Sequence, residues 1–178
     1  MKVMRLLSSL KHDESERGIF HLGRALVKNE HTSIIVSSAD EDNDLVKRLK
    51  RDGNIYHQLH MNKKSWLSLL QVTSLRRLIE KYDPDVIHVH SRTPAWILHL
   101  ALRRARVKRM PKLVSTMYGF YPINKYSQAL LAVDTIITVS DSVTNYLKKG
   151  LRLEDADPKT IKRIYRGVDT RRYPYRHN

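Results

Sequence analysis

The chain has 178 residues, no cysteine and a formal net charge of +15 at pH 7. A chain of this length can bury its own core as one domain, and the lack of cysteine excludes a disulfide framework and a thiolate metal site. No apolar run reaches the roughly 18 residues that cross a bilayer. The residues after Met1 also lack the apolar core and the cleavage site of a signal peptide.

The basic residues are numerous: 33 Lys and Arg face 18 Asp and Glu, and they occur in pairs spread along the chain. Such a surface attracts anions, which include nucleic acid, acidic lipid headgroups and phosphorylated substrates. The alternative is a solvated basic surface that only keeps the protein soluble. Nucleic-acid binding rests on charge alone and is not expected, because the sequence has no helix-turn-helix spacing, aromatic RNA-binding strand or zinc site.

In the first half of the chain, short apolar segments alternate with segments of helical periodicity. Ile19, Leu22 and Leu26 recur at the three- and four-residue spacing of an amphipathic helix. Asp42 is the expected N-cap of the next helix. In chain order, the pattern predicts a strand at 3–8, a helix at 16–28, a strand at 33–37, a helix at 42–51, a strand at 55–59 and a helix at 65–82.

The second half continues this alternation. Pro94 suits the first turn of a helix, where its missing N–H group costs nothing, and Gly150 is expected to close the last helix. The polar and basic residues 170–178 are expected to form a linker or tail. In chain order, the pattern predicts a strand at 85–90, a helix at 94–106, a strand at 112–117, a helix at 126–132, a strand at 135–139, a helix at 142–149 and a strand at 161–165.

Strands that alternate with helices form right-handed βαβ units. The sequence therefore predicts an α/β fold with a mostly parallel sheet and helices on both faces, in three αβα layers. Ligands bind in the loops after the carboxyl ends of such strands. Hydroxyl, amide and cationic groups, which suit sugar hydroxyls and phosphates, are common in these loops, at 9–17, 91–93, 118–124, 140–141 and 166–169.

Two histidines on one strand are the first candidates for the site. His88 and His90 lie two residues apart and therefore share a face. A metal site needs at least one more ligand, and the spacing supplies none, so no metal is expected. One of the pair is expected in the core with a hydrogen bond, and His90, nearer the strand end, is the better pocket residue. For Arg92, a phosphate or carboxylate partner and a plain surface ion pair both remain open.

The loop after the 112–117 strand contains a glycine and several aromatic residues. Gly119 would allow a tight turn or a close approach of the backbone. Phe120, Tyr121 and Tyr126 form an aromatic cluster, either packed under the loop or stacked on a sugar or lipid. Fingerprints for dinucleotides, nucleoside triphosphates and serine hydrolases are missing, since the sequence has no G-x-G-x-x-G, no P-loop and no G-x-S-x-G.

Five short motifs follow one another in a recognisable order: Glu16-Arg-Gly18 with Leu22-Gly-Arg-Ala-Leu26, Pro84-Asp-Val-Ile-His-Val-His-Ser-Arg92, Thr116-x-x-Gly-Phe-Tyr121, Asp134-x-x-Ile-x-Val-Ser-x-x-Val143 and Arg166-Gly-Val-Asp169. In these motifs the chain resembles the N-terminal Rossmann-like domain of family-4 retaining glycosyltransferases with the GT-B architecture, and it is most similar to lipopolysaccharide-type transferases. The resemblance implies a glycosyltransferase N-terminal domain at 1–169, a linker at 170–178, and no C-terminal nucleotide-sugar-binding domain within the chain.

The family implies sugar transfer from a nucleotide sugar, with retention, usually without a metal, and with no other cofactor. The acceptor binds mainly to the N-terminal half, whereas the C-terminal half holds the nucleotide and a Glu-x7-Glu motif. Residue by residue, the resemblance assigns substrate binding to Glu16, Arg17, His90, Ser91, Arg92, Gly119, Ser140, Arg166 and Gly167. The catalytic residue stays unknown, since Tyr118 stands at the position of the family's His. Asp13-Glu14 replace the family's Gly-Gly.

These observations lead to two hypotheses. In the first, the chain is the acceptor-binding half of a transferase for a glycan or lipid-linked acceptor, inactive alone and completed by a C-terminal half in trans. It would be cytoplasmic and peripheral on the inner face of the membrane, with its basic surface toward anionic lipid. Trp96, Ile97 and Leu100, ahead of the basic 103–106 segment, would dock there or face the sheet. In the second, the chain is a non-catalytic glycan- or phosphosugar-binding or regulatory module.

Overall fold

The computed structural model describes residues 1–10, 14–61, 69–122, 124–151 and 161–167, with only the backbone described at 14–17 and 151. Its centre is a seven-stranded sheet in the order β3-β2-β1-β4-β5-β6-β7, and every neighbouring pair is parallel. The predicted α/β class is confirmed. The strands are β1 (Lys2–Leu6), β2 (Thr32–Ser37), β3 (Ile55–Gln58), β4 (Val86–Val89), β5 (Lys112–Met117), β6 (Thr135–Thr138) and β7 (Ile161–Arg163).

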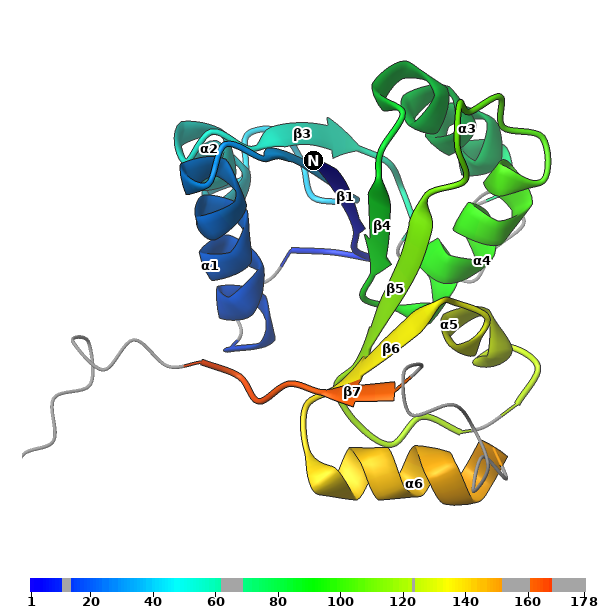
Figure 1. Ribbon diagram of the computed structural model, residues 1–178. Coiled ribbons are helices and arrows are strands. Elements are labelled where there is room, and N and C mark those ends of the chain that lie inside the picture. The colour runs from blue at the N-terminus through cyan, green and yellow to red at the C-terminus, as the bar shows by residue number, and fades with distance from the viewer. Residues whose placement is uncertain (11–13, 62–68, 123, 152–160, 168–178) are drawn as a thin grey trace, which may run out of the picture.

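Helices cover both faces of the sheet and complete three layers (Figure 1). On one face lie α1 (Glu14–Lys28) and α2 (Asp44–Arg51), whose apolar residues pack with those of β2 and β3. The opposite face carries α3 (Gln71–Tyr82), α4 (Arg92–Leu102), α5 (Gln128–Leu131) and α6 (Asp141–Leu151). The larger core lies under this second group, where Met4, Leu6, Ile34 and Ile87 are fully buried.

The strand order reverses between β1 and β4. The chain moves outward from β1 to β3, then returns to pair β4 with the free side of β1. Ligands of open parallel sheets bind at such a reversal, beyond the carboxyl ends of the two strands. A backbone hydrogen bond from His90 N to Leu6 O, 3.0 Å long, joins the ends of β1 and β4 at this point. The fold therefore directs attention to the residues that follow β4.

The face that α1 and α2 occupy is covered only over β1–β3 (Figure 1). The strand register places Val114 of β5 and Ile137 of β6 on this face together with His88. Both aliphatic side chains are only partly buried, and Ile164, beyond β7, is 53% exposed. Among the described residues, no helix packs over this part of the sheet.

Several predicted boundaries need correction. The N-cap of α2 is Asn43, not Asp42, because Asn43 Oδ1 accepts the hydrogen bond from Leu45 N at 2.8 Å. Gly150 lies inside α6 rather than closing it. The helix predicted at 94–106 runs from Arg92 to Leu102, and β7 ends at Arg163. The predictions for residues 65–68 and 170–178 lie outside the described residues.

Candidate functional site

The two histidines of the β4 segment have different environments. His88 Nε2 lies 2.7 Å from Thr116 Oγ1 on β5, so this side chain is buried with its hydrogen bond made within the sheet. His90 Nδ1 lies 2.6 Å from the hydroxyl of Tyr118, the first residue after β5. The two imidazole rings are 4.1 Å apart. The expectation of one core histidine with a hydrogen bond is confirmed for His88, whereas His90, expected as the pocket residue, is equally buried and its role in a pocket stays a prediction.

His90, Tyr118 and Arg166 come together from the ends of β4, β5 and β7. The guanidinium of Arg166 lies 4.8 Å from the centre of the Tyr118 ring. His90 is 8% exposed, yet its Nε2 atom is buried without a hydrogen-bond partner among the described residues. A buried polar atom without a partner is uncommon in native proteins and calls for an explanation, such as a functional role, local strain or a bound water.

Burial keeps this group of side chains neutral apart from Arg166. It lowers the pKa of His88 to about 4, and it holds the pKa of His90 well below its ordinary value, with the neighbouring His88 and Arg5 adding to the effect on His90. Burial also raises the pKa of Tyr118 to about 12. A neutral imidazole carries one N–H and one lone pair, so His90 Nε2 can donate to or accept from a sugar hydroxyl, depending on the direction of the Tyr118 bond.

A buried arginine lies beneath the site. Arg5 of β1 is fully buried and donates to Ile19 O of α1, and its second terminal nitrogen lies 3.0 Å from Ser33 Oγ and 3.2 Å from Asn54 Oδ1. Burial lowers the pKa of Arg5 to about 10, so it stays charged at pH 7. Arg5 thereby fixes α1 against the sheet. The sequence analysis missed this role, although an arginine inside an apolar strand was a visible signal.

Ser91 occupies the N-cap position of α4 without capping it. Its side chain makes no cap hydrogen bond, and its Oγ atom is buried without a partner among the described residues. Pro94, in the first turn, has no N–H group to satisfy. The first backbone N–H groups of α4 therefore receive no side-chain cap from Ser91, and a helix N-terminus of this kind favours anions.

Arg92, the first residue of α4, lies between two tyrosine rings. Its guanidinium carbon is 5.3 Å from the ring centre of Tyr121 and 5.0 Å from that of Tyr126. The aromatic cluster therefore holds a cation instead of packing ring on ring. Phe120 is not part of it, since Phe120 is 63% exposed and contacts Tyr146 edge-on at 5.2 Å.

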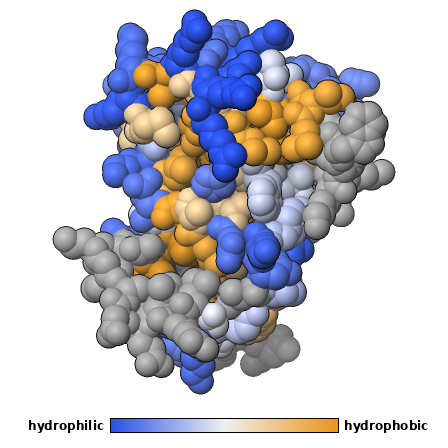
Figure 2. All heavy atoms as spheres, turned by 90° about the vertical axis from the view of Figure 1, so that its right-hand side faces the viewer, coloured by the Kyte–Doolittle hydropathy of each residue, from blue (hydrophilic) through white to orange (hydrophobic). Residues whose placement is uncertain are grey.

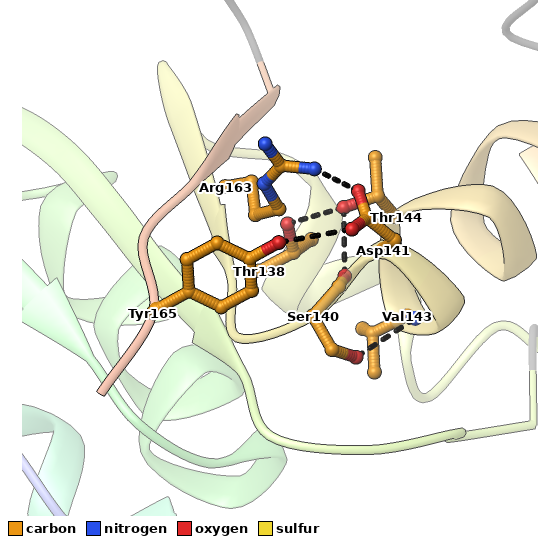
Figure 3. Close-up of polar contacts among 7 residues, drawn as sticks. All are labelled: Thr138, Ser140, Asp141, Val143, Thr144, Arg163 and Tyr165. Atoms are coloured by element: carbon orange, nitrogen blue, oxygen red, sulfur yellow. Dashed lines mark hydrogen bonds and ion pairs between the residues drawn. The ribbon is translucent and has the colours of Figure 1, made fainter.

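Ser140 serves the start of α6 (Figure 3). Ser140 Oγ accepts from Val143 N at 3.3 Å, and its carbonyl accepts from Thr144 Oγ1 at 2.9 Å. Next to it, Asp141 accepts hydrogen bonds from Arg163 and from the Tyr165 hydroxyl, which ties α6 to β7 and the segment beyond it. The contacts of Ser140 are thus those of a helix cap.

The remaining predicted site residues contribute less. Glu16 and Arg17 lie at the start of α1, but their side chains are outside the described residues. Neither Gly119 nor Gly167 has a positive φ, and a Cβ atom at either position would meet nothing within 4 Å. The chain bends at Gly119, but neither its φ nor the space around it requires a glycine there. Packing requires glycine elsewhere: a Cβ would lie 2.5 Å from Asn54 Oδ1 at Gly23 of α1, and 2.8 Å from Val27 Cγ1 at Gly53, whose φ is +83°.

Comparison with known proteins now decides the family. The profile of Glycosyltransferase Family 4 matches residues 15–172. The chain belongs to glycosyltransferase family 4. A search of curated protein sequences gives no match.

Solved structures share the fold of this family-4 chain. A glycosyltransferase from Rickettsia africae is 26% identical with a TM-score of 0.76, and the match covers 97% of this chain and 45% of that one. The lipopolysaccharide outer core galactosyltransferase WaaB follows at 15% identity and a TM-score of 0.70, covering 94% of this chain and 46% of WaaB. Anabaena HepE, solved with UDP and glucose, is 17% identical with a TM-score of 0.66, and the match covers 97% of this chain and 46% of HepE. The family-4 chain thus spans about half the length of these GT-B structures.

The described part of the family-4 chain has no group of three or more His, Asp or Glu side chains that could hold a metal ion. None of its described helices is long and apolar enough to cross a bilayer. In α4, Ile97 is buried in the core, whereas Trp96 is 40% exposed and donates to Tyr126 O at 2.9 Å. The apolar side of α4 therefore faces mainly the sheet.

The outer side of α3 and α4 faces the viewer in Figure 2, where hydrophilic side chains gather at the top above an apolar band. The exposed basic residues of the α4–β5 connection, among them Arg103, Arg104 and Arg106, follow the C-terminal end of α4. Helices of βαβ units run antiparallel to their strands, so this connection lies at the amino edge of the sheet. The basic cluster and the His90 site are therefore at opposite edges.

Proposed function

We propose that this family-4 chain is the acceptor-binding half of a glycosyltransferase that moves a sugar from a nucleotide sugar to a glycan or lipid-linked acceptor. The observation that carries the proposal is the set of uncommitted polar groups at the end of β4. His90 Nε2 and Ser91 Oγ are buried without a partner among the described residues, and Arg92 follows directly. Burying such atoms without a hydrogen bond costs about 1–3 kcal/mol each, which a bound ligand would recover.

Each residue has a role in this proposal. His90 hydrogen-bonds an acceptor hydroxyl and is held in orientation by Tyr118. Arg166, over the Tyr118 ring, adds positive charge at the mouth of the site. In the reaction, the acceptor oxygen bonds to the anomeric carbon as the bond to the nucleotide diphosphate breaks, and the hydroxyl proton leaves with the diphosphate. His90 and Tyr118 position the hydroxyl for this step.

The donor belongs to a second half, in the same protein or in a separate chain. The 178 residues match 45–46% of the three solved relatives. HepE, whose structure holds UDP and glucose, supports a nucleotide sugar as the donor class. Catalysis needs donor and acceptor held together in a closed cleft, so the 178 residues alone are inactive in this proposal.

We further propose a lipopolysaccharide-type acceptor, transfer with retention, and peripheral contact with the inner face of the cytoplasmic membrane. WaaB is a structural relative, and the net charge of +15 favours anionic lipid.

The test is a transfer assay with a panel of nucleotide sugars and lipid-linked or soluble glycan acceptors. The chain alone is expected to give no product above the rate without protein. The chain combined with a donor-binding half containing Glu-x7-Glu is expected to give product, and replacing His90 by Ala in that pair should lower kcat/KM by about 100-fold, in line with loss of a positioning contact. Product from the chain alone would contradict the half-enzyme proposal.

A second candidate is a non-catalytic glycan- or phosphosugar-binding module. The observation in its favour is Tyr118, whose hydroxyl already bonds His90 at the position where the resemblance expects the family's His. This candidate predicts glycan binding by the chain and no transfer with any donor-binding half. Restoring His by Tyr118→His should then leave the paired protein inactive as well.

A further inference from the structure

Arg92 differs from the ion-paired arginines of the described residues. Arg24, Arg109 and Arg163 each contact a carboxylate, on Asp52, Asp85 and Asp141. Among the described residues Arg92 has no carboxylate within 4 Å and donates no hydrogen bond, although it is partly buried. Aromatic contacts leave the five N–H donors of a guanidinium free, so within the described part of the chain the hydrogen-bonding capacity of Arg92 is unused.

The two tyrosines that hold Arg92 are tied to neighbouring helices. The Tyr126 hydroxyl lies 2.5 Å from Thr93 Oγ1, and the Tyr126 carbonyl accepts a hydrogen bond from Trp96, so two residues of α4 hold Tyr126. The backbone of Tyr121 is held by α6, because its carbonyl accepts from the Tyr146 hydroxyl at 2.9 Å. The guanidinium therefore lies in ordered surroundings, which lowers the entropy lost when a ligand binds.

The surroundings of Arg92 favour a negative charge. The α4 N-terminus lacks a side-chain cap, and the adjacent Ser91 Oγ and His90 Nε2 are buried without partners among the described residues. A planar guanidinium pairs with the two oxygens of a carboxylate or phosphate through parallel hydrogen bonds. An uncharged sugar offers no such pair of anionic oxygens.

We infer that Arg92, held between Tyr121 and Tyr126, forms with Ser91 and the α4 N-terminus a recognition site for an anionic group, a phosphate or carboxylate, on the acceptor sugar. The site binds by charge and paired hydrogen bonds, and the two tyrosines support the arginine rather than stack on a sugar. The assignment of this anion to the acceptor rests on the proposed function, whereas the anion site itself does not.

The test is an NMR titration of the 15N-labelled chain with glucose 6-phosphate, glucuronate, glucose and UDP. The two charged sugars are expected to shift the amide signals of Arg92, Thr93 and Tyr126, and glucose is expected to shift none of them. The charged sugar that binds more tightly in the titration identifies the recognised group as phosphate or carboxylate. Equal shifts with glucose would overturn the inference. Shifts there from UDP alone would assign the site to the donor and overturn the acceptor assignment.

Variants separate this site from the general charge of the protein. Arg92→Gln should weaken glucose 6-phosphate or glucuronate binding about tenfold or more, since a charge-assisted hydrogen-bond pair is lost. Arg92→Lys keeps the charge but not the planar fork, so its affinity for the charged sugar should lie between those of the unchanged chain and Arg92→Gln. Arg103→Gln removes the same charge from an exposed position and is the matched control. Equal weakening by Arg92→Gln and Arg103→Gln, or none by Arg92→Gln, would overturn the inference.

The titration needs no donor and no second half, so its outcome is independent of the transfer assay. Binding that depends on Arg92, with no transfer by the completed pair, would contradict only the proposed function. Transfer by the completed pair, with binding indifferent to Arg92, would contradict only the anion site. Amide spectra of the variants, compared away from residues 118–126, verify that each is folded.

Discussion

At the scale of single residues, the contact between His90 and Tyr118 is the most consequential of the site. It joins the buried His90 to the partly buried Tyr118 across adjacent strand ends at 2.6 Å. Because His90 Nε2 has no partner among the described residues, this is the one hydrogen bond that orients the ring.

Tyr118→Phe should therefore destabilise the fold. Removing the hydroxyl leaves the buried His90 Nδ1 without its partner, at a cost of about 1–3 kcal/mol in the free energy of unfolding. Urea denaturation measures this. Tyr165→Phe also loses a tyrosine hydrogen bond, to Asp141, but at an exposed position, and should cost less than about 1 kcal/mol. Equal costs for the two variants would show that burial of the His90 pair does not matter.

The buried histidines should also make stability depend on pH. The pKa of His88 falls from its ordinary 6.5 to about 4 in the folded state. Between these values the unfolded chain binds the proton and the native chain does not, so the free energy of unfolding decreases as pH falls through this window. For His88 the total loss is on the order of 3 kcal/mol. His90 acts in the same direction.

Urea denaturation at pH 7, 6, 5 and 4 measures this dependence. His88→Asn should flatten it, because the titrating group is gone. If the free energy of unfolding of His88→Asn fell with pH as steeply as that of the unchanged chain, the assignment of this dependence to His88 would be contradicted. Carboxylates with lowered pKa values, such as Asp141, also lose their contribution in acid, and the comparison with the unchanged chain cancels them.

At the scale of elements, α1 depends on a close approach to the sheet. A Cβ at Gly23 would lie 2.5 Å from Asn54 Oδ1 and 2.6 Å from Arg5 Nη2. Those atoms cannot move freely, because Ser33, Asn54 and Arg5 are bonded to one another. The glycine thus lets the helix cover a buried cation whose hydrogen-bond partners come from α1, from β2 and from the turn before β3.

Gly23→Ala should destabilise the protein despite the better helix propensity of alanine. Overpacking costs about 1–3 kcal/mol, against a propensity gain of about 1 kcal/mol. Gly18→Ala, in the same helix, is the matched control, because a Cβ there meets nothing within 4 Å, and it should stabilise the protein. The Tm values of both variants, measured by thermal unfolding, test these two expectations. A rise in Tm for Gly23→Ala would show that Asn54 yields easily.

Much of the fold follows from local pattern, because buried parallel strands are short apolar runs and their helices carry a regular apolar stripe. The segment at 112–117 matches β5 at both ends. Boundaries fail where a hydrogen bond decides them, as at Asn43. His90 and Arg92 could be predicted as site residues from the sequence because they follow an apolar strand. The partners of Arg5 could not be predicted, since they come from distant segments whose proximity only the tertiary structure establishes.

At the scale of the whole molecule, the two faces of the sheet are unequal. The α3–α6 face buries a continuous core, whereas Val114 and Ile137 on the other face are only partly covered and Ile164 is largely exposed. His90 and Tyr118 continue the alternation of His88 and Val114, so they lie on the side of the sheet that carries the exposed strand face. A structure that covered that face would therefore also border His90.

The position of β1 has a consequence for how the protein forms. β1 pairs with β2 on one side, but its other neighbour, β4, lies about eighty residues further along the chain. On the ribosome, at about 5–20 residues per second, the first strands emerge several seconds before β4 does. During that interval one edge of β1, with its fully buried Met4 and Leu6, lacks its partner strand. The nascent chain therefore passes through a stage that is open to intermolecular strand pairing, and the arrival of β4 closes it.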